Sequence, residues 1–190
     1  ISSPSGPLSR EELADAYAEQ MEALIEGGVD CLLIETIFDV ENAYVALEAS
    51  ERVMDRLSCR LPVMLSFSQV NDEGINMNGQ DVFEFIRRAA RRFDIFSVGV
   101  NCTSEPRNLQ PVVQRMAASL PFHISVYGNA GMPDSKGRYL QSPESFAEQN
   151  WAMVNSRCVN IGGGCCGTTD KHIALLRHLV EPLPGCYAPP

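Results

Sequence analysis

Residues 159–169 are Val159-Asn160-Ile161-Gly162-Gly163-Gly164-Cys165-Cys166-Gly167-Thr168-Thr169, an apolar run followed by glycines, two adjacent cysteines and a helix start. Neighbouring residues of a regular strand point to opposite faces, so both sulfurs reach one point only where the backbone turns sharply. Glycines on either side supply the positive-φ freedom that such a turn requires. The motif predicts two thiolates at the end of a strand, and a Gly-rich loop with incidental cysteines or a vicinal disulfide is the alternative.

The rest of the chain alternates between buried-strand patterns and amphipathic helix patterns. The predicted strands are 29–34, 62–67, 95–100, 122–127 and 158–161, and a helix follows each of them. A further helix precedes the first strand and begins with the capping-box sequence Ser9-Arg10-Glu11-Glu12. Alternation at this spacing predicts parallel βα units in one α/β domain, with a leader at 1–8, the βα units at 9–180 and a tail at 181–190.

Polar residues of the types that bind ligands or take part in catalysis follow four of the five predicted strands. These residues are Glu35, Asn101-Cys102, Asn129 and Cys165-Cys166. A (β/α)₈ TIM-type barrel builds its active site at this rim, whereas a doubly wound sheet gathers ligands at one switch point. The pattern therefore favours the barrel. Five βα units are fewer than eight, so the chain is expected to carry only the C-terminal five units of such a barrel.

The amino-acid composition argues against several classes of binding partner and of fold. The chain has 190 residues, 24 acidic and 15 basic residues, and a net charge of −9, which disfavours nucleic acid and anionic membranes. Seven cysteines at irregular spacing do not suit a disulfide scaffold. With no signal-peptide pattern and no apolar run of membrane-spanning length, a reducing, cytoplasmic location is expected. We expect Cys31 and Cys158 to be core residues, and His172 and His178 to lie on a helix surface.

Cys102, Cys165 and Cys166 are the candidate metal ligands. Three thiolates converging on one point suit Zn²⁺ and leave a fourth position open, as in catalytic rather than structural zinc sites. Three anionic sulfurs make the zinc a weak Lewis acid, and its better role is to hold a substrate thiol as the thiolate that accepts an alkyl group.

The residues around these cysteines resemble a known family. Gly99-Val100-Asn101-Cys102 and Gly163-Gly164-Cys165-Cys166-Gly167 are similar to the zinc motifs of the homocysteine S-methyltransferases. That family includes betaine–homocysteine methyltransferase and the homocysteine-binding module of cobalamin-dependent methionine synthase, and the methionine synthase module is the more similar of the two. Three further segments are also similar to strand-end segments of the methionine synthase module: 34–39, Asn78-Gly79-Gln80, and Asn129-Ala130-Gly131-Met132-Pro133 with Gly137-Arg138-Tyr139.

The resemblance implies a (β/α)₈ barrel, zinc on Cys102, Cys165 and Cys166, homocysteine as methyl acceptor and methionine as product. It also implies that Glu35 contacts homocysteine. A helix N-terminal charge is the alternative for Glu35. Asn129 is either a turn residue or part of the substrate site, where it can fill the fourth zinc position. The family barrel has three more strands at its N-terminal side, and a missing N-terminal barrel segment is therefore an expected partner.

Two classes of function remain open from the sequence. The first is a zinc-dependent thiol methyltransferase acting on homocysteine or another small thiol. The second is a non-catalytic partial barrel in which the three cysteines hold a structural zinc. Within the first class the methyl donor is also open: methyl-cobalamin, with the corrinoid carried by another domain or chain, S-methylmethionine, or a betaine.

Overall fold

The computed structural model describes residues 6–185, and the outer parts of the predicted leader and tail, including Cys186, lie outside this range. Its strands are β1 (Leu32–Ile37), β2 (Val63–Phe67), β3 (Ile95–Asn101), β4 (His123–Gly128) and β5 (Ile161–Gly164). Its helices are α1 (Arg10–Glu26), α2 (Val40–Arg56), α3 (Val82–Ala89), α4 (Pro106–Ser119), α5 (Pro143–Asn155) and α6 (Asp170–Val180). No helix within the described residues is long and apolar enough to cross a membrane.

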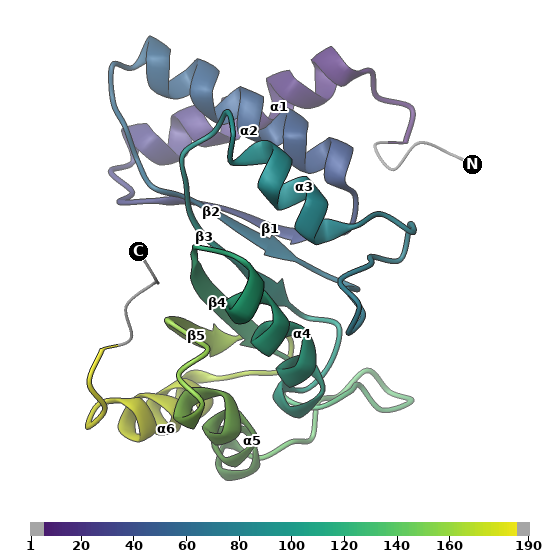
Figure 1. The fold of residues 1–190 in the computed structure, drawn as a ribbon, viewed down its shortest axis with the longest axis vertical. Helices are drawn as coiled ribbons and strands as arrows, with labels where there is room; N and C mark the ends of the chain where they lie inside the picture. Colours follow the sequence, from purple (N-terminus) through teal and green to yellow (C-terminus); the bar gives the residue numbers. More distant parts are fainter. Residues whose placement is uncertain (1–5, 186–190) are drawn as a thin grey trace.

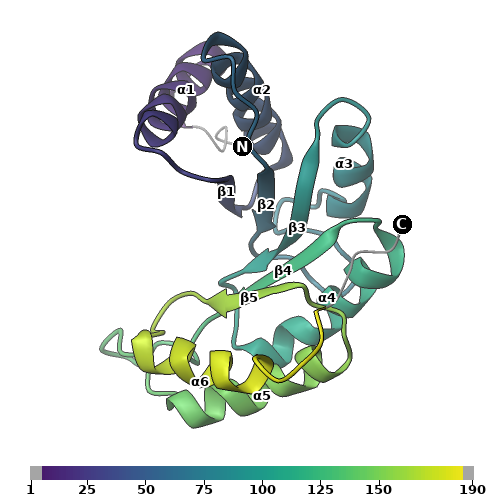
Figure 2. The ribbon, with the colours of Figure 1, turned by 90° about the vertical axis from the view of Figure 1, so that its left-hand side faces the viewer.

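The five strands form one parallel sheet in the order β1-β2-β3-β4-β5, as predicted (Figure 1). Each strand returns through a helix, which is how parallel neighbours are connected. In Figure 2 the strands follow one another along the molecule, with α1 and α2 at one end and α5 and α6 at the other. All five carboxyl ends therefore lie along the same edge of the sheet.

The two faces of the sheet differ in chemistry. One face packs against the helices and forms the apolar core, with Leu65, Val98 and Val126 at 0–2% exposure. On the other face the register places Ser66 beside Gly99 and Gly99 beside Ser125. A Cβ on Gly99 would lie 1.9 Å from the backbone oxygen of Ser125, so this inner face needs small residues where neighbouring strands approach closely.

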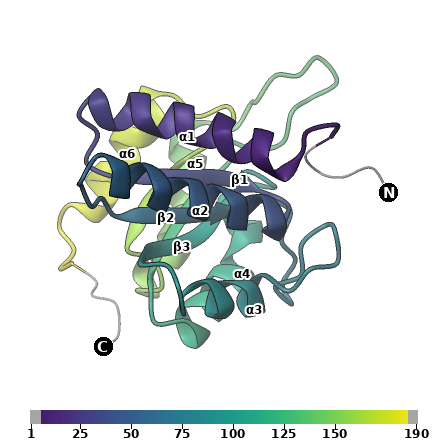
Figure 3. The same cartoon turned by 90° about the horizontal axis from the view of Figure 1, so that it is seen from above.

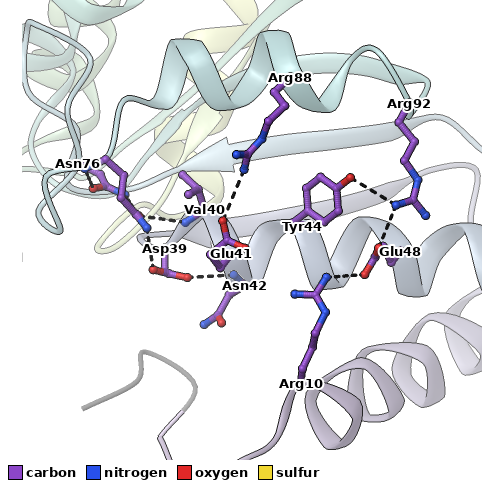
Figure 4. Close-up of polar contacts among 11 residues, drawn as sticks. Arg10, Asp39, Val40, Glu41, Asn42, Tyr44, Glu48, Asn76, Arg88 and Arg92 are labelled. Carbon is purple, nitrogen blue, oxygen red and sulfur yellow. Dashed lines mark hydrogen bonds and ion pairs between the residues drawn. The ribbon is translucent and has the colours of Figure 1, made fainter. Parts of the chain in front are cut away.

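Helices α1 and α2 pack side by side over the β1 end of the sheet (Figure 3). Glu48 of α2 joins three elements, since its carboxylate accepts from Arg10 at 2.6 Å and from Arg92, just after α3, at 2.9 Å (Figure 4). Asp39 caps α2 by accepting from the backbone N–H of Asn42 at 2.9 Å (Figure 4). These contacts fix the helix that follows the carboxyl end of β1.

The helix starts predicted at Ser9 and after the cysteine pair are confirmed. Ser9 and Glu12 make the expected reciprocal capping box. Ser142 caps α5 with Pro143 at its first position, and Thr169 caps α6. The side chain of His172 also enters the α6 cap. The prediction of a surface histidine is therefore wrong for His172, which is buried at 5% exposure, whereas His178 is exposed as expected.

Two strands begin three residues later than predicted. Strand β1 covers 32–37 rather than 29–34, so Glu35 lies inside the strand and not after it. Cys31 precedes β1 and is exposed, which makes its expected place in the core wrong. Strand β5 covers 161–164 rather than 158–161, so the glycine triplet is itself the strand. Cys158 is partly buried and packs against the core, short of the full burial expected.

Candidate metal centre

Cys102 follows β3 directly, and Cys165 and Cys166 follow β5. Their sulfur atoms all lie within 4.8 Å of one another, as the sequence predicted. Cys102 Sγ is 2.7 Å from Cys165 Sγ and 3.5 Å from Cys166 Sγ, and the two adjacent cysteines have their sulfurs 4.0 Å apart. Two strand ends that are separated by β4 in the sheet thus deliver three thiols to one point.

The adjacent cysteines reach one point because the chain turns immediately after β5. Of the four flanking glycines only Gly167, at φ 79°, has a positive φ, so the expectation that glycines on both sides supply this freedom is confirmed after the cysteine pair and wrong before it. Gly163 and Gly164 are required by close approach instead. A Cβ on Gly163 would lie 2.8 Å from Tyr127 Cδ1, and one on Gly164 would lie 2.4 Å from Thr168 Cγ2.

The loops that carry the cysteines are tied to β4. The N–H of Cys102 donates to the carbonyl of Tyr127 at 2.9 Å, and the N–H of Cys165 donates to that of Gly128 at 2.8 Å. Asn129 Oδ1 accepts from the N–H of Cys166 at 3.2 Å. The buried amide of Asn129 therefore lies beside the cysteine pair and positions its backbone.

Contacts among the three thiols shift the pKa values of Cys102 and Cys166. Burial and hydrogen bonds with the two other sulfurs raise the pKa of the Cys102 thiol to about 12. The pKa of Cys166 is lowered, chiefly because its sulfur accepts from Cys102. At neutral pH the cluster therefore retains the Cys102 proton, and a metal that binds here must displace it.

Tyr139 has no role predicted from the sequence, yet it lies at the thiol cluster. Its hydrogen bond with Cys166 raises the pKa of the Tyr139 hydroxyl. The aromatic side chain packs over Gly167, where a Cβ would lie 2.2 Å from Tyr139 Cβ. The loop between β4 and α5 thus covers one side of the thiol cluster.

Asn101 is a further residue near the cluster to which sequence reasoning gave no role. It is the last residue of β3 and has 0% exposure. Its amide contacts Thr36 of β1 and Ser66 of β2, and Nδ2 lies 4.0 Å from Cys165 Sγ. Its position directly before Cys102 at a strand end was the available signal.

Glu35 lies apart from the thiols, on the exposed side of β1. It borders a cavity of about 450 Å³ that is lined by residues of α1 and β1, among them Met21, Leu24 and Leu33. Burial raises the pKa of Tyr127, and the negative charge of Glu35 adds to the rise.

The donor set fits zinc better than a hard cation. Three sulfurs without a carboxylate match the preference of Zn²⁺, whereas Mg²⁺ and Ca²⁺ require oxygen ligands. Zinc–sulfur bonds of about 2.3 Å in a tetrahedron place sulfurs about 3.8 Å apart. Two of the three separations, 3.5 and 4.0 Å, lie close to this value, and the 2.7 Å pair must open by about 1 Å.

A parallel βα sheet with three thiols at its carboxyl edge defines a TIM-barrel-type protein with a candidate sulfur metal site. The family model described as homocysteine S-methyltransferase matches residues 1–180. The chain belongs to the homocysteine S-methyltransferase family.

Solved structures of the homocysteine methyltransferase MmuM from Escherichia coli have the same fold. The apo form superposes with a TM-score of 0.69 at 21% identity, covering 94% of this chain and 60% of that one. The metallated form gives a TM-score of 0.62 at 22% identity and covers 87% and 51%. This chain therefore spans about three-fifths or less of the length of these TIM-barrel neighbours.

Proposed function

We propose that this chain carries the metal-binding part of a zinc-dependent methyltransferase that converts homocysteine to methionine. The observation that supports this most is the convergence of Cys102, Cys165 and Cys166 at the carboxyl edge of the sheet in a member of this family. Zinc bound there supplies one chemical effect, which is to keep the thiol of homocysteine deprotonated and nucleophilic at neutral pH.

The protein groups around the thiols suit this role. Cys102, Cys165 and Cys166 are partly accessible, so a small thiol can approach them from the carboxyl side of the sheet. Asn129 and the backbone bonds to β4 hold the two cysteine loops in fixed relation. Asn129 remains a candidate for direct substrate contact, because its amide lies beside Cys166.

Glu35 is proposed to bind the amino group of homocysteine. It is exposed on β1, and its charge reaches Tyr127 on the inner face of the sheet. A carboxylate is a suitable partner for an ammonium group, and the three thiols already provide the metal ligands. The reacting sulfur and the amino group would thus be bound by different strand ends.

The methyl donor is the open part of the proposal. Transfer of radiolabelled methyl groups from methyl-cobalamin, S-methylmethionine and betaine to homocysteine should be measured with zinc quantified in the same sample. Methionine formation with one donor, dependent on zinc, is the expected result. Zinc-loaded protein that is complemented by the missing N-terminal barrel segment, binds homocysteine and transfers no methyl group from any donor would contradict the proposed reaction.

The alternative of a non-catalytic partial barrel also has an observation in its favour. The chain covers 60% of the MmuM chain, so residues 1–190 lack the counterpart of a large part of that barrel. In this case the three cysteines would bind zinc as a structural staple. The metal would then be indifferent to thiols, whereas the methyltransferase must change its metal ligands when homocysteine is added.

A further inference from the structure

Asn101 contacts two other strands and the thiol cluster through one buried amide. Its Oδ1 accepts from the N–H of Thr36 at 3.1 Å and from the hydroxyl of Ser66 at 2.8 Å. Its Nδ2 donates to Thr36 Oγ1 at 2.9 Å and points to Cys165 Sγ at 4.0 Å. Every hydrogen-bonding position of this amide is therefore directed to a neighbouring strand end or to the thiols.

Thr36 has an unusual backbone that this amide maintains. Its φ of 58° lies in the left-handed region, which β-branched residues rarely adopt. The register of β1 against β2 shifts between Ile34 and Ile37 at the same point. Asn101 bonds both the N–H and the hydroxyl of Thr36, and this two-point contact holds the backbone next to Glu35.

On its other side Asn101 is connected to the metal ligands. Cys102 is the next residue and also has a left-handed backbone, with φ at 55°. An amide N–H directed at Cys165 Sγ is the kind of outer hydrogen-bond donor that orients and supports a metal ligand. The same side chain thus touches the strand end with Glu35 and the sulfur of a metal ligand.

We propose that Asn101 is a positioning residue that holds the β1 strand end and the thiol cluster in a fixed relation and supports Cys165 as a metal ligand through its amide N–H. This inference rests on the proposed function, because it assumes that Glu35 and the cysteines bind two ends of one substrate. The positioning acts through Thr36 and Cys165, and Asn101 itself touches neither substrate nor metal.

Asn101→Asp is the discriminating substitution. A carboxylate can still accept from the N–H of Thr36 and from the hydroxyls of Thr36 and Ser66, so the contacts between strands persist. Towards Cys165, however, it replaces an N–H donor with a negative charge. Zinc that displaces three thiol protons lowers the charge of the site by one unit, so a neighbouring carboxylate disfavours binding. Ser66→Ala is the matched control, because it removes one bond to Asn101 and leaves Nδ2 in place.

The test uses the full chain and measures zinc affinity by competition with a chromophoric chelator, together with the thiolate-to-metal absorption of the Co²⁺ form. Asn101→Asp should weaken zinc binding roughly 10- to 100-fold relative to Ser66→Ala and change the Co²⁺ absorption. Both proteins should have the same far-ultraviolet circular dichroism spectrum without metal. Equal zinc affinity and equal Co²⁺ spectra in the two variants would overturn the proposal.

A second pair of variants tests the positioning role of Asn101 if Asn101→Asp does not fold. Thr36→Val removes the hydroxyl that fixes Nδ2, whereas Thr36→Ser keeps it. Weaker zinc binding by threefold or more in Thr36→Val than in Thr36→Ser supports the positioning role, and equal binding contradicts it.

These readouts require no methyl transfer. An effect of Asn101→Asp on zinc affinity in a protein that never methylates homocysteine would leave the positioning role standing and remove the proposed function. Homocysteine methylation together with unchanged zinc affinity in Asn101→Asp would overturn the positioning role and leave the proposed function standing.

Discussion

The three cysteines are the residues on which the proposed chemistry depends. Cys166→Ala removes one of three converging sulfurs, so we expect loss of most bound zinc and of all methyl transfer. Cys31→Ser is the control, because Cys31 is exposed, lies outside the cluster and should leave the zinc content unchanged. Zinc per protein measured by atomic emission provides the comparison. Full zinc occupancy in Cys166→Ala would rule out this ligand set.

Glu35 is predicted to bind substrate and to have no part in holding the metal. Glu35→Gln removes the charge that attracts an ammonium group and keeps the shape of the side chain. The homocysteine concentration needed for half-maximal methyl transfer should therefore rise, while the zinc content stays at the wild-type level. Steady-state kinetics and metal analysis on the same preparation measure both effects. Loss of zinc in Glu35→Gln would mean that the carboxylate supports the metal site after all.

Among the elements, β5 depends on glycines that have no room for a side chain. A Cβ on Gly164 would meet Thr168, whose hydroxyl donates to the carbonyl of Cys165 at 2.7 Å. Gly164→Ala should lower the free energy of unfolding by about 1–3 kcal/mol and weaken zinc binding. Gly162→Ala is the matched control, since its nearest neighbour is 4.0 Å away. Urea unfolding of the two variants gives the difference, and equal stability would show that close approach at Gly164 is unimportant.

The sequence predicted the order of the elements well because helix periodicity and caps are local properties. Ser9 with Glu12, and the Ser142 hydroxyl accepting from the N–H of Ser145, fix helix starts through bonds within one turn. The two misplaced strands have a different cause. The run 29–34 is largely apolar, yet pairing with β2 begins at Leu32, and β5 consists mostly of glycines, which strand propensity disfavours. Their position depends on neighbouring strands that a single sequence does not reveal.

The candidate site was predictable only in part, because some of its contacts join residues that are far apart in the sequence. The convergence of Cys102 with Cys165 and Cys166 followed from the rule that parallel strand ends share one edge. The roles of Asn101 and Tyr139 did not follow, because each depends on contacts with residues far along the chain. Likewise, the burial of His172 depends on its bonds to Thr169 and to the carbonyl of Gln141.

The inner face of the sheet is only partly covered at its β1 end. Leu33 pairs in register with Met64 and is 40% exposed, and β1 pairs on one side only within the described residues. We propose that further barrel strands, in the same polypeptide or on an associating chain, cover this face and edge. Free strand edges and exposed apolar side chains promote association.

Residues 1–190 expressed alone are therefore expected to self-associate or to unfold with low cooperativity. Sedimentation velocity and thermal unfolding measure the two properties. Leu33→Lys places a charge at the uncovered edge and should reduce association if this edge is responsible. A monodisperse monomer of residues 1–190 that unfolds cooperatively and transfers methyl groups would contradict the proposed need for further strands.

We propose that the three cysteines hold a zinc to which the thiol of homocysteine binds. X-ray absorption at the zinc edge, recorded with and without homocysteine, tests it most directly. We expect three sulfur ligands and one lighter ligand in the zinc-loaded protein, and four sulfur ligands at saturating homocysteine. A zinc shell that stays unchanged at saturating homocysteine, or that never contains three sulfurs, would contradict it.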